Sequence, residues 1–218
     1  DWSSDVCSSD LKEGNFRQRL REWCWDKKDK QGKQRTDWEV SQSFAPLLKW
    51  ILALWSSEER QLVLAIDATS LKKLFVVLSV SVAYRGCAIP IAWTILPEGQ
   101  KGSWKEPWLN LFSCLQGCTP VDWKVIVTAD RGLYARWLYE AIQKCGWHPF
   151  LRINQRSLYR PKGFSDFRPM SQLLSSPGSV WSGRVTCFGV HSVEGTLLAC
   201  WGTKHLEPWL ILTDLPPE

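Results

Sequence analysis

The sequence lacks any apolar run long enough to cross a membrane as a helix, which takes about 20 residues. Its longest apolar run, Leu74 to Tyr84, contains two serines and is followed by Arg85. Histidine is scarce as well: the three, at positions 148, 191 and 205, are scattered and unpaired. They offer no partners for a zinc site at Cys114 and Cys118, so buried thiols are the better interpretation of that pair. The first absence excludes a helical membrane protein, and the second argues against a zinc module.

What the chain has in quantity is apolar and aromatic sequence. Of its 218 residues, 44% are hydrophobic and 15 are Trp. This content can build a sizeable core and excludes wholesale disorder. The length fits one large domain, or one and a half. We expect most tryptophans in the core and a few as flat platforms for bases or sugars.

Residues 1–11 read DWSSDVCSSDL and have no periodicity. The string resembles the in-frame translation of a sequencing adapter, so we expect an artefact there; a natural polar tail is the alternative. Without it, 27 basic residues face 19 acidic ones and the net charge rises from +5 to +8. That charge favours a partner rich in phosphate. Seven scattered cysteines remain, an odd set that indicates reduced thiols in a cytosol.

The rest of the chain divides into three parts by composition. Residues 12–60 form a basic and helical connector, with a helix expected over Phe44–Trp55. Its basic cluster at 27–35 is either a DNA-touching arm or a solvated connector. Residues 61–154 have the pattern of alternating strands and helices, and residues 155–218 are β-rich. The β-rich part begins with a loop-like basic stretch, Gln155–Pro169, and short strands follow from Val180.

Residues 61–154 have the pattern of a mixed α/β sheet. Proline at position 90 marks the third expected strand as an edge strand, because proline cannot donate to a ladder. The pattern predicts the order β-β-β-α-β-α-β, with helices on the faces of the sheet. The expected strands are Leu62–Ile66, Leu74–Tyr84, Cys87–Leu96, Trp123–Ala129 and Phe150–Ile153, and the expected helices are Trp104–Leu115 and Leu133–Cys145.

Two aspartates follow buried-looking strands. Asp67 ends the first expected strand and Asp130 ends the fourth, and the two strands are neighbours in this order. Paired carboxylates repel unless a cation lies between them, and Mg²⁺ prefers such oxygen ligands. The alternative is that each aspartate caps the turn that follows it. The residues alone do not decide between these interpretations.

Five segments resemble bacterial insertion-sequence transposases of the DDE type. The resemblance is closest to the branch whose signature is Tyr-x2-Arg-x3-Glu-x6-Lys, and it covers most of the chain from about Leu47. It implies a ribonuclease-H-like fold with a β-rich insertion before the last catalytic helix. The segments are LVLAIDATSL, LSVSVAYRGCAIPIAWTILP, KGSWKEPWLNLF, VIVTADRGLYARWLYEAIQKCGWHPFLRIN and EPWLILTDLPPE.

The resemblance implies that Asp67 and Asp130 are the first two acids of a catalytic triad. With a third acid they would hold two Mg²⁺ (or Mn²⁺) ions for cleavage of double-stranded DNA at the element's ends and transfer of the freed 3′-hydroxyl to target DNA. The third acid and its signature are missing, because Glu194, Glu207 and Glu218 have no Tyr and Arg at the required spacing. We therefore expect a fragment that is clipped at both ends and inactive by itself.

Basic residues near Asp130 and in the insertion are candidate DNA contacts. For Arg131 a surface salt bridge is an equal alternative, whereas for any one of the others a position in a solvated loop is the favoured alternative. The resemblance further implies a bacterial cytoplasmic protein that acts at the nucleoid and a homodimer in the DNA complex. The competing hypothesis is a DNA-binding transposase remnant without catalysis. The candidate contacts are Arg131, Arg152, Arg156, Arg160, Lys162 and Arg168.

Overall fold

The computed structural model describes residues 25, 27–29, 39–55, 58, 60–99, 104–189 and 191–217. The chain divides into two units, Asp1–Val40 and Ser41–Glu218. The first contains the short 3-10 turn η2 (Lys27–Asp29), and a second turn, η3 (Val40–Ser43), crosses the boundary. The expectations for residues 1–11, for most of the basic cluster at 27–35 and for Glu218 lie outside the described residues.

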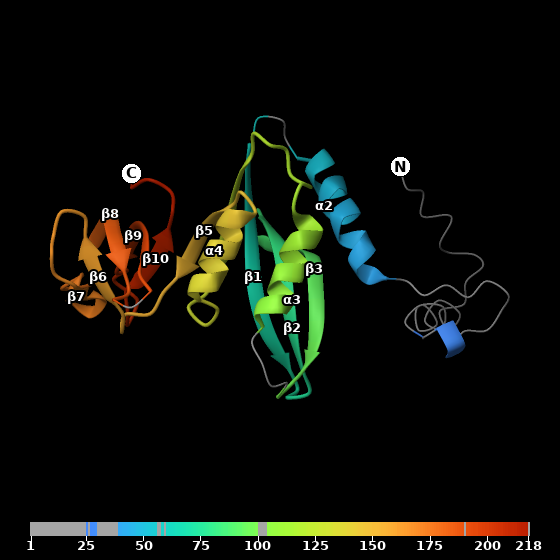
Figure 1. Ribbon diagram of the computed structural model, residues 1–218, viewed down its shortest axis with the longest axis horizontal. Coiled ribbons are helices and arrows are strands. Elements are labelled where there is room, and N and C mark those ends of the chain that lie inside the picture. The colour runs from blue at the N-terminus through green and yellow to red at the C-terminus, as the bar shows by residue number, and fades with distance from the viewer. Residues whose placement is uncertain are drawn as a thin grey trace. The chain divides into compact units, whose positions relative to one another are not determined.

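The second unit is built on one mixed sheet of ten strands in the order β3-β2-β1-β4-β5-β10-β9-β8-β6-β7 (Figure 1). Its first three strands form an antiparallel meander, and β4 and β5 run parallel to β1. The coarse expectation of a mixed α/β sheet is therefore confirmed. These five strands are β1 (Gln61–Leu71), β2 (Phe75–Tyr84), β3 (Cys87–Pro97), β4 (Lys124–Ala129) and β5 (His148–Arg152).

The third strand lies at one edge of the sheet, as its proline predicts. Ser81 of β2 faces Pro90, whereas its neighbour Val80 faces Ala92, so the register shifts at a bulge. A bulge inserts one unpaired residue in a strand, and an edge strand tolerates it best. The proline and the bulge together explain why no further described strand pairs with the outer edge of β3.

Three helices cover one face of the β1–β5 half. α2 (Phe44–Ala53), α3 (Lys105–Leu115) and α4 (Arg136–Lys144) bury apolar stripes that join the core cluster of the sheet. Trp108 of α3 is 1% exposed and Leu64 of β1 is fully buried. Because side chains alternate along a strand, the residues between the buried ones point to the opposite face. Within the described residues, no helix is both long and apolar enough to cross a membrane.

The remaining strands continue the same sheet from β5. β10 pairs antiparallel with β5 on one side and with β9 on the other, and β8, β6 and β7 follow outward. Every neighbouring pair in this half is antiparallel. These strands are β6 (Leu158–Pro161), β7 (Arg168–Pro169), β8 (Val180–Cys187), β9 (Val193–Cys200) and β10 (Trp209–Thr213), with the 3-10 turn η4 (Met170–Gln172) after β7.

Three local expectations are wrong. Asp67 does not end its strand, because β1 continues to Leu71 by pairing with β2 beyond the end of β4. Gln155–Pro169 is not a plain loop: β6 and β7 pair within it, and Tyr159 is buried there at 6% exposure. The helix expected from Leu133 begins at Arg136, because Ala135 before it is still extended, at φ −150° and ψ 148°.

Candidate functional site

The two candidate aspartates lie side by side on neighbouring parallel strands. The last pair in the β1–β4 register is Ile66 with Ala129; Asp67 is the next residue of β1, and Asp130 is the residue that directly follows β4. Neighbouring strands are about 4.8 Å apart, so the two backbones are close at this point. Ile66 and Ala129 are buried under the helices, so both aspartates point to the open face of the sheet, where both are exposed.

The surroundings of the two aspartates differ. Asp67 is within β1, opposite Ser79 of β2, and its carboxylate accepts a hydrogen bond from the Thr69 hydroxyl. Asp130 lies in the turn after β4, where its backbone carbonyl accepts a bond from the Leu133 N–H at 3.0 Å. The capping alternative therefore fails for Asp67, which precedes no turn, whereas Asp130 does take part in a turn.

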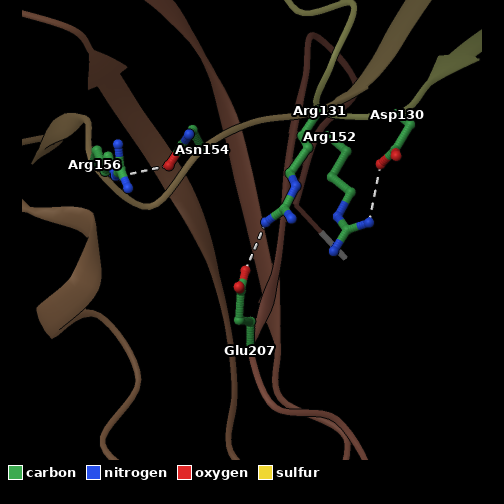
Figure 2. A network of polar contacts seen from close by, with 6 residues as sticks. All are labelled: Asp130, Arg131, Arg152, Asn154, Arg156 and Glu207. Atoms are coloured by element: carbon green, nitrogen blue, oxygen red, sulfur yellow. Dashed lines mark hydrogen bonds and ion pairs between the residues drawn. The ribbon is translucent and has the colours of Figure 1, made fainter.

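Asp130 is bound to a cation. The Arg152 guanidinium donates to its carboxylate at 2.9 Å, and the two side chains face each other at the end of β5 (Figure 2). The backbone N–H of Arg131, and after it the Arg152 guanidinium, hold the pKa of Asp130 below its ordinary value of 3.8. The Asp130 side chain is nevertheless 70% exposed and Arg152 only 21%. The carboxylate is thus ionised, oriented and open to solvent.

Arg131 is adjacent in sequence but bonded elsewhere. Its guanidinium points away from Asp130 and binds the Glu207 carboxylate at 2.6 Å, in the segment just before β10 (Figure 2). Of the two interpretations of Arg131, the salt bridge is thus the one present. The Arg131–Glu207 contact links the turn after β4 to the segment before β10, and the Asp130–Arg152 contact links the same turn to β5.

Arg152 has a second partner in Trp209, the first residue of β10. The guanidinium carbon lies 4.5 Å from the indole centroid, within the range of a cation–π contact. Around this pair, cross-strand neighbours on the open face line a groove of about 840 Å³, most of whose lining is apolar. The groove opens at Asp130 and includes Thr128, Phe150, Arg152, Leu198, Trp209 and Ile211.

Three of the other predicted DNA contacts form a separate group. Arg160, Lys162 and Arg168, which we call the hairpin cations, lie on β6, β7 and the loop between them. Arg160 lies over the Phe167 ring at 4.9 Å and Arg168 over the Phe164 ring at 5.0 Å. Among the residues that the structure describes, no ion pair involves these three. Arg156 stands outside both groups; its backbone N–H bonds to the Asn154 side chain at 3.0 Å.

The two carboxylates fit a hard divalent cation. Two neighbouring, exposed carboxylates on one face provide oxygen ligands of the type Mg²⁺ prefers, with open positions for water or phosphate oxygens. In the described part of the chain, no group of three or more His, Cys, Asp and Glu side chains is placed to hold a metal. The site therefore offers two ligands, one of which also binds Arg152.

Sequence reasoning missed Glu207, Trp209 and Thr69. The sequence presents Glu207 only as a possible third acid, and Trp209 only as part of the segment EPWLILTDLPPE. Their partners are 76 residues away for Glu207 and 57 positions away for Trp209, so no local pattern reveals them. Thr69 could have been found, because a hydroxyl two residues after Asp67 on an extended strand lies on the same face.

Comparison with known proteins shows only weak similarity. The chain matches no model of a protein family and no curated protein sequence. Among solved structures it is similar to the Mos1 transposase catalytic domain, determined with Raltegravir and Mn, at 16% identity and a TM-score of 0.29. That match covers 51% of this chain and 58% of the other, so the chain spans less than two thirds of that domain. We therefore infer a function from the residues of this chain alone.

Proposed function

We propose that the chain is part of the catalytic domain of a DDE-type DNA transposase with a ribonuclease-H-like core. The observation that carries the proposal is the position of Asp67 and Asp130, one residue beyond the last pair of two parallel central strands and on the same open face. A bacterial insertion-sequence element is the source that the sequence segments favour. On this proposal the protein acts in the bacterial cytoplasm, at the nucleoid.

Asp67 and Asp130 are the residues that would hold Mg²⁺ or Mn²⁺, with two ions in the complete site. When bound, such ions supply Lewis-acid stabilisation and activation of the attacking oxygen for phosphodiester cleavage and strand transfer. The chain's own residues prepare the site: Thr69 orients Asp67, while the Arg131 N–H and Arg152 keep Asp130 ionised. A third carboxylate completes the family triad, and the described residues do not place one there.

DNA is the partner that the cations favour. The hairpin cations have no carboxylate partner among the described residues, and the two arginines among them lie against aromatic rings. Guanidinium and ammonium groups free of internal carboxylates can bind phosphates and release counterions. Two DNA ends must be brought together for transposition, so a homodimer in the DNA complex belongs to the same proposal.

A second candidate function is DNA binding without catalysis. The observation that favours it is the Arg152 contact, which occupies one of only two carboxylates in a site without a described third ligand. The two candidates predict the same DNA affinity but differ in metal binding.

Titration of the chain with Mn²⁺, followed by electron paramagnetic resonance, tests the proposal. We expect a site that is lost in Asp67→Asn and in Asp130→Asn, because each removes a charged oxygen ligand. Asp122→Asn is the matched control: Asp122 is an exposed aspartate paired with Arg60 at 3.3 Å, on the segment before β4. If Asp122→Asn weakens Mn²⁺ binding as much as the other two, the ion binds by general charge and the catalytic assignment is wrong.

A cleavage assay separates the two candidate functions. In a chain extended past Glu218 by a helix with the Tyr-x2-Arg-x3-Glu-x6-Lys signature, we expect metal-dependent nicking that Asp67→Asn and Asp130→Asn abolish while DNA binding persists. Nicking that survives both substitutions would refute the assignment. Binding without any nicking would favour the second candidate.

A further inference from the structure

The carboxylate of Asp130 has two competing uses. In the structure it accepts the Arg152 guanidinium at 2.9 Å, and in the proposed function it is a ligand of a divalent cation. The Arg152 contact takes up oxygen lone pairs on the exposed side chain that a cation would use. The inference that follows rests on the proposed function, and it concerns which groups set the affinity for that cation.

Trp209 determines where Arg152 lies. Arg152 pairs across the strands with Ile211, two residues from Trp209 on the same face of β10. Its guanidinium stacks on the indole at 4.5 Å, and the side chain is only 21% exposed. A flat guanidinium on a flat ring keeps its N–H groups directed outward in the plane, and one of them reaches Asp130. The indole thus holds the Arg152 guanidinium in a position from which it donates to the Asp130 carboxylate.

We infer that Arg152, held on the Trp209 indole, competes with the divalent cation for Asp130, so that Trp209 is a positioning residue that sets the metal affinity. When the cation binds, the Asp130–Arg152 hydrogen bond breaks, and the guanidinium is released at the mouth of the groove. It remains beside the site, where a DNA phosphate would lie. The same arginine would thereby bind first the Asp130 carboxylate and then a phosphate of the DNA substrate.

Arg131 provides the contrast that makes the inference specific. It lies next to Asp130 in sequence and has the same charge, but its guanidinium is bound to Glu207 at 2.6 Å. Removal of Arg131 changes the electrostatic field at Asp130 without removing a direct competitor. Arg131→Gln therefore measures the effect of one neighbouring positive charge, whereas Trp209→Leu keeps every charge and tests the placement of the direct competitor.

The test is a Mn²⁺ titration of the full 218-residue chain and four variants, by electron paramagnetic resonance. We expect Arg152→Gln to raise the Mn²⁺ affinity about threefold to fivefold, the upper part of the range that loss of one partly exposed ion pair allows. Trp209→Leu keeps every charge and should raise it about twofold to threefold, since it removes only the cation–π contact. Trp209→Phe retains a ring and should restore the wild-type value. Arg131→Gln should change the affinity less than about twofold.

An arginine side-chain NMR experiment gives a second readout. The Nε–Hε resonance that disappears in Arg152→Gln identifies Arg152, and we expect it to shift when Mg²⁺ is added. It should not shift in Asp130→Asn. Melting temperatures of all variants verify that each is folded, and Trp209, at 46% exposure, is a position where a smaller side chain should be accommodated.

The outcomes separate the inference from the proposed function. Unchanged Mn²⁺ affinity in Arg152→Gln and Trp209→Leu, with binding still lost in Asp130→Asn, overturns the inference and leaves the metal site standing. Equal increases in Arg152→Gln and Arg131→Gln also overturn it, because they indicate a field effect. Mn²⁺ binding that survives both Asp67→Asn and Asp130→Asn removes the metal site itself, and the inference with it.

Discussion

Two groups of cations share the second unit of this chain, and they differ in what they contact. The edge cations, Arg131 and Arg152, are bound to the carboxylates of Glu207 and Asp130. The hairpin cations, Arg160, Lys162 and Arg168, have no ion pair among the described residues, and the two arginines lie over phenylalanine rings. An aromatic ring holds a guanidinium without neutralising it. An arginine can thus be paired with a carboxylate of its own chain in one place and remain available for a DNA phosphate in another.

The largest expected effect comes from neutralising the hairpin. Arg160→Gln with Arg168→Gln should lower the affinity for duplex DNA about tenfold at low salt and reduce the salt slope by about 2, because two phosphate contacts are lost. Fluorescence anisotropy at several salt concentrations measures both quantities. Arg60→Gln with Arg136→Gln is the matched control, since it removes the same charge from arginines paired with Asp122 and Glu140. An equal loss in the control would show that only net charge matters and would remove the distinction between the groups.

A smaller effect is expected from the rings alone. Phe164→Leu with Phe167→Leu keeps all three hairpin charges but removes the surfaces on which Arg160 and Arg168 lie. The affinity for DNA should fall about twofold to threefold while the salt slope stays unchanged, because the cations become less ordered without being lost. A reduced slope would contradict this, since it would mean that the rings decide whether a phosphate is contacted at all.

The smallest expected effect is the pH dependence of stability, which should differ between the two groups. The pKa of Asp130 is lower in the folded chain than its ordinary value of 3.8, so its contribution to stability is present above that pH and is lost as pH falls through the lower folded-state value. The destabilisation caused by Arg152→Gln should therefore shrink in acid, whereas that of Arg160→Gln should not. Because Asp130 is 70% exposed, solvent screening keeps this contribution small. Urea unfolding of the wild-type chain and both variants at pH 6 and at acidic pH measures it. If the destabilisation caused by the two substitutions changes with pH in the same way, the assigned Asp130–Arg152 contact is contradicted.

The sequence predicted the location of the site better than its contacts. Val125 and Val127 alternate with less buried residues and are followed by Asp130, a local signal that the structure retains. Asp67 was expected at a strand end because Ala68, Thr69 and Ser70 have the composition of a turn. The long partner strand β2 instead extends β1, and that pairing is not encoded near Asp67.

The segment that contains β6 and β7 shows why other parts could not be predicted. Gln155–Pro169 has glycine, prolines and charges in no regular period, as a loop does. It forms a hairpin because Tyr159 is buried and packs edge-on against Trp181, a residue 22 positions away, with ring centroids 6.0 Å apart. The contacts of Arg131 and Arg152 likewise span 76 and 22 positions in the chain. Such partners are selected by the tertiary fold, so composition can identify the cations but not their partners.

The proline in β3 has a consequence for how copies of this chain meet. Among the described strands, the two outermost are β3, which contains Pro90 and ends at Pro97, and β7, which ends at Pro169. A proline has no N–H to offer a strand from another molecule, and the bulge beside Pro90 spoils the straight edge that such a strand would need. Both outer strands therefore disfavour edge-to-edge addition at these prolines, which favours association of two copies through side chains over extension of the ladder.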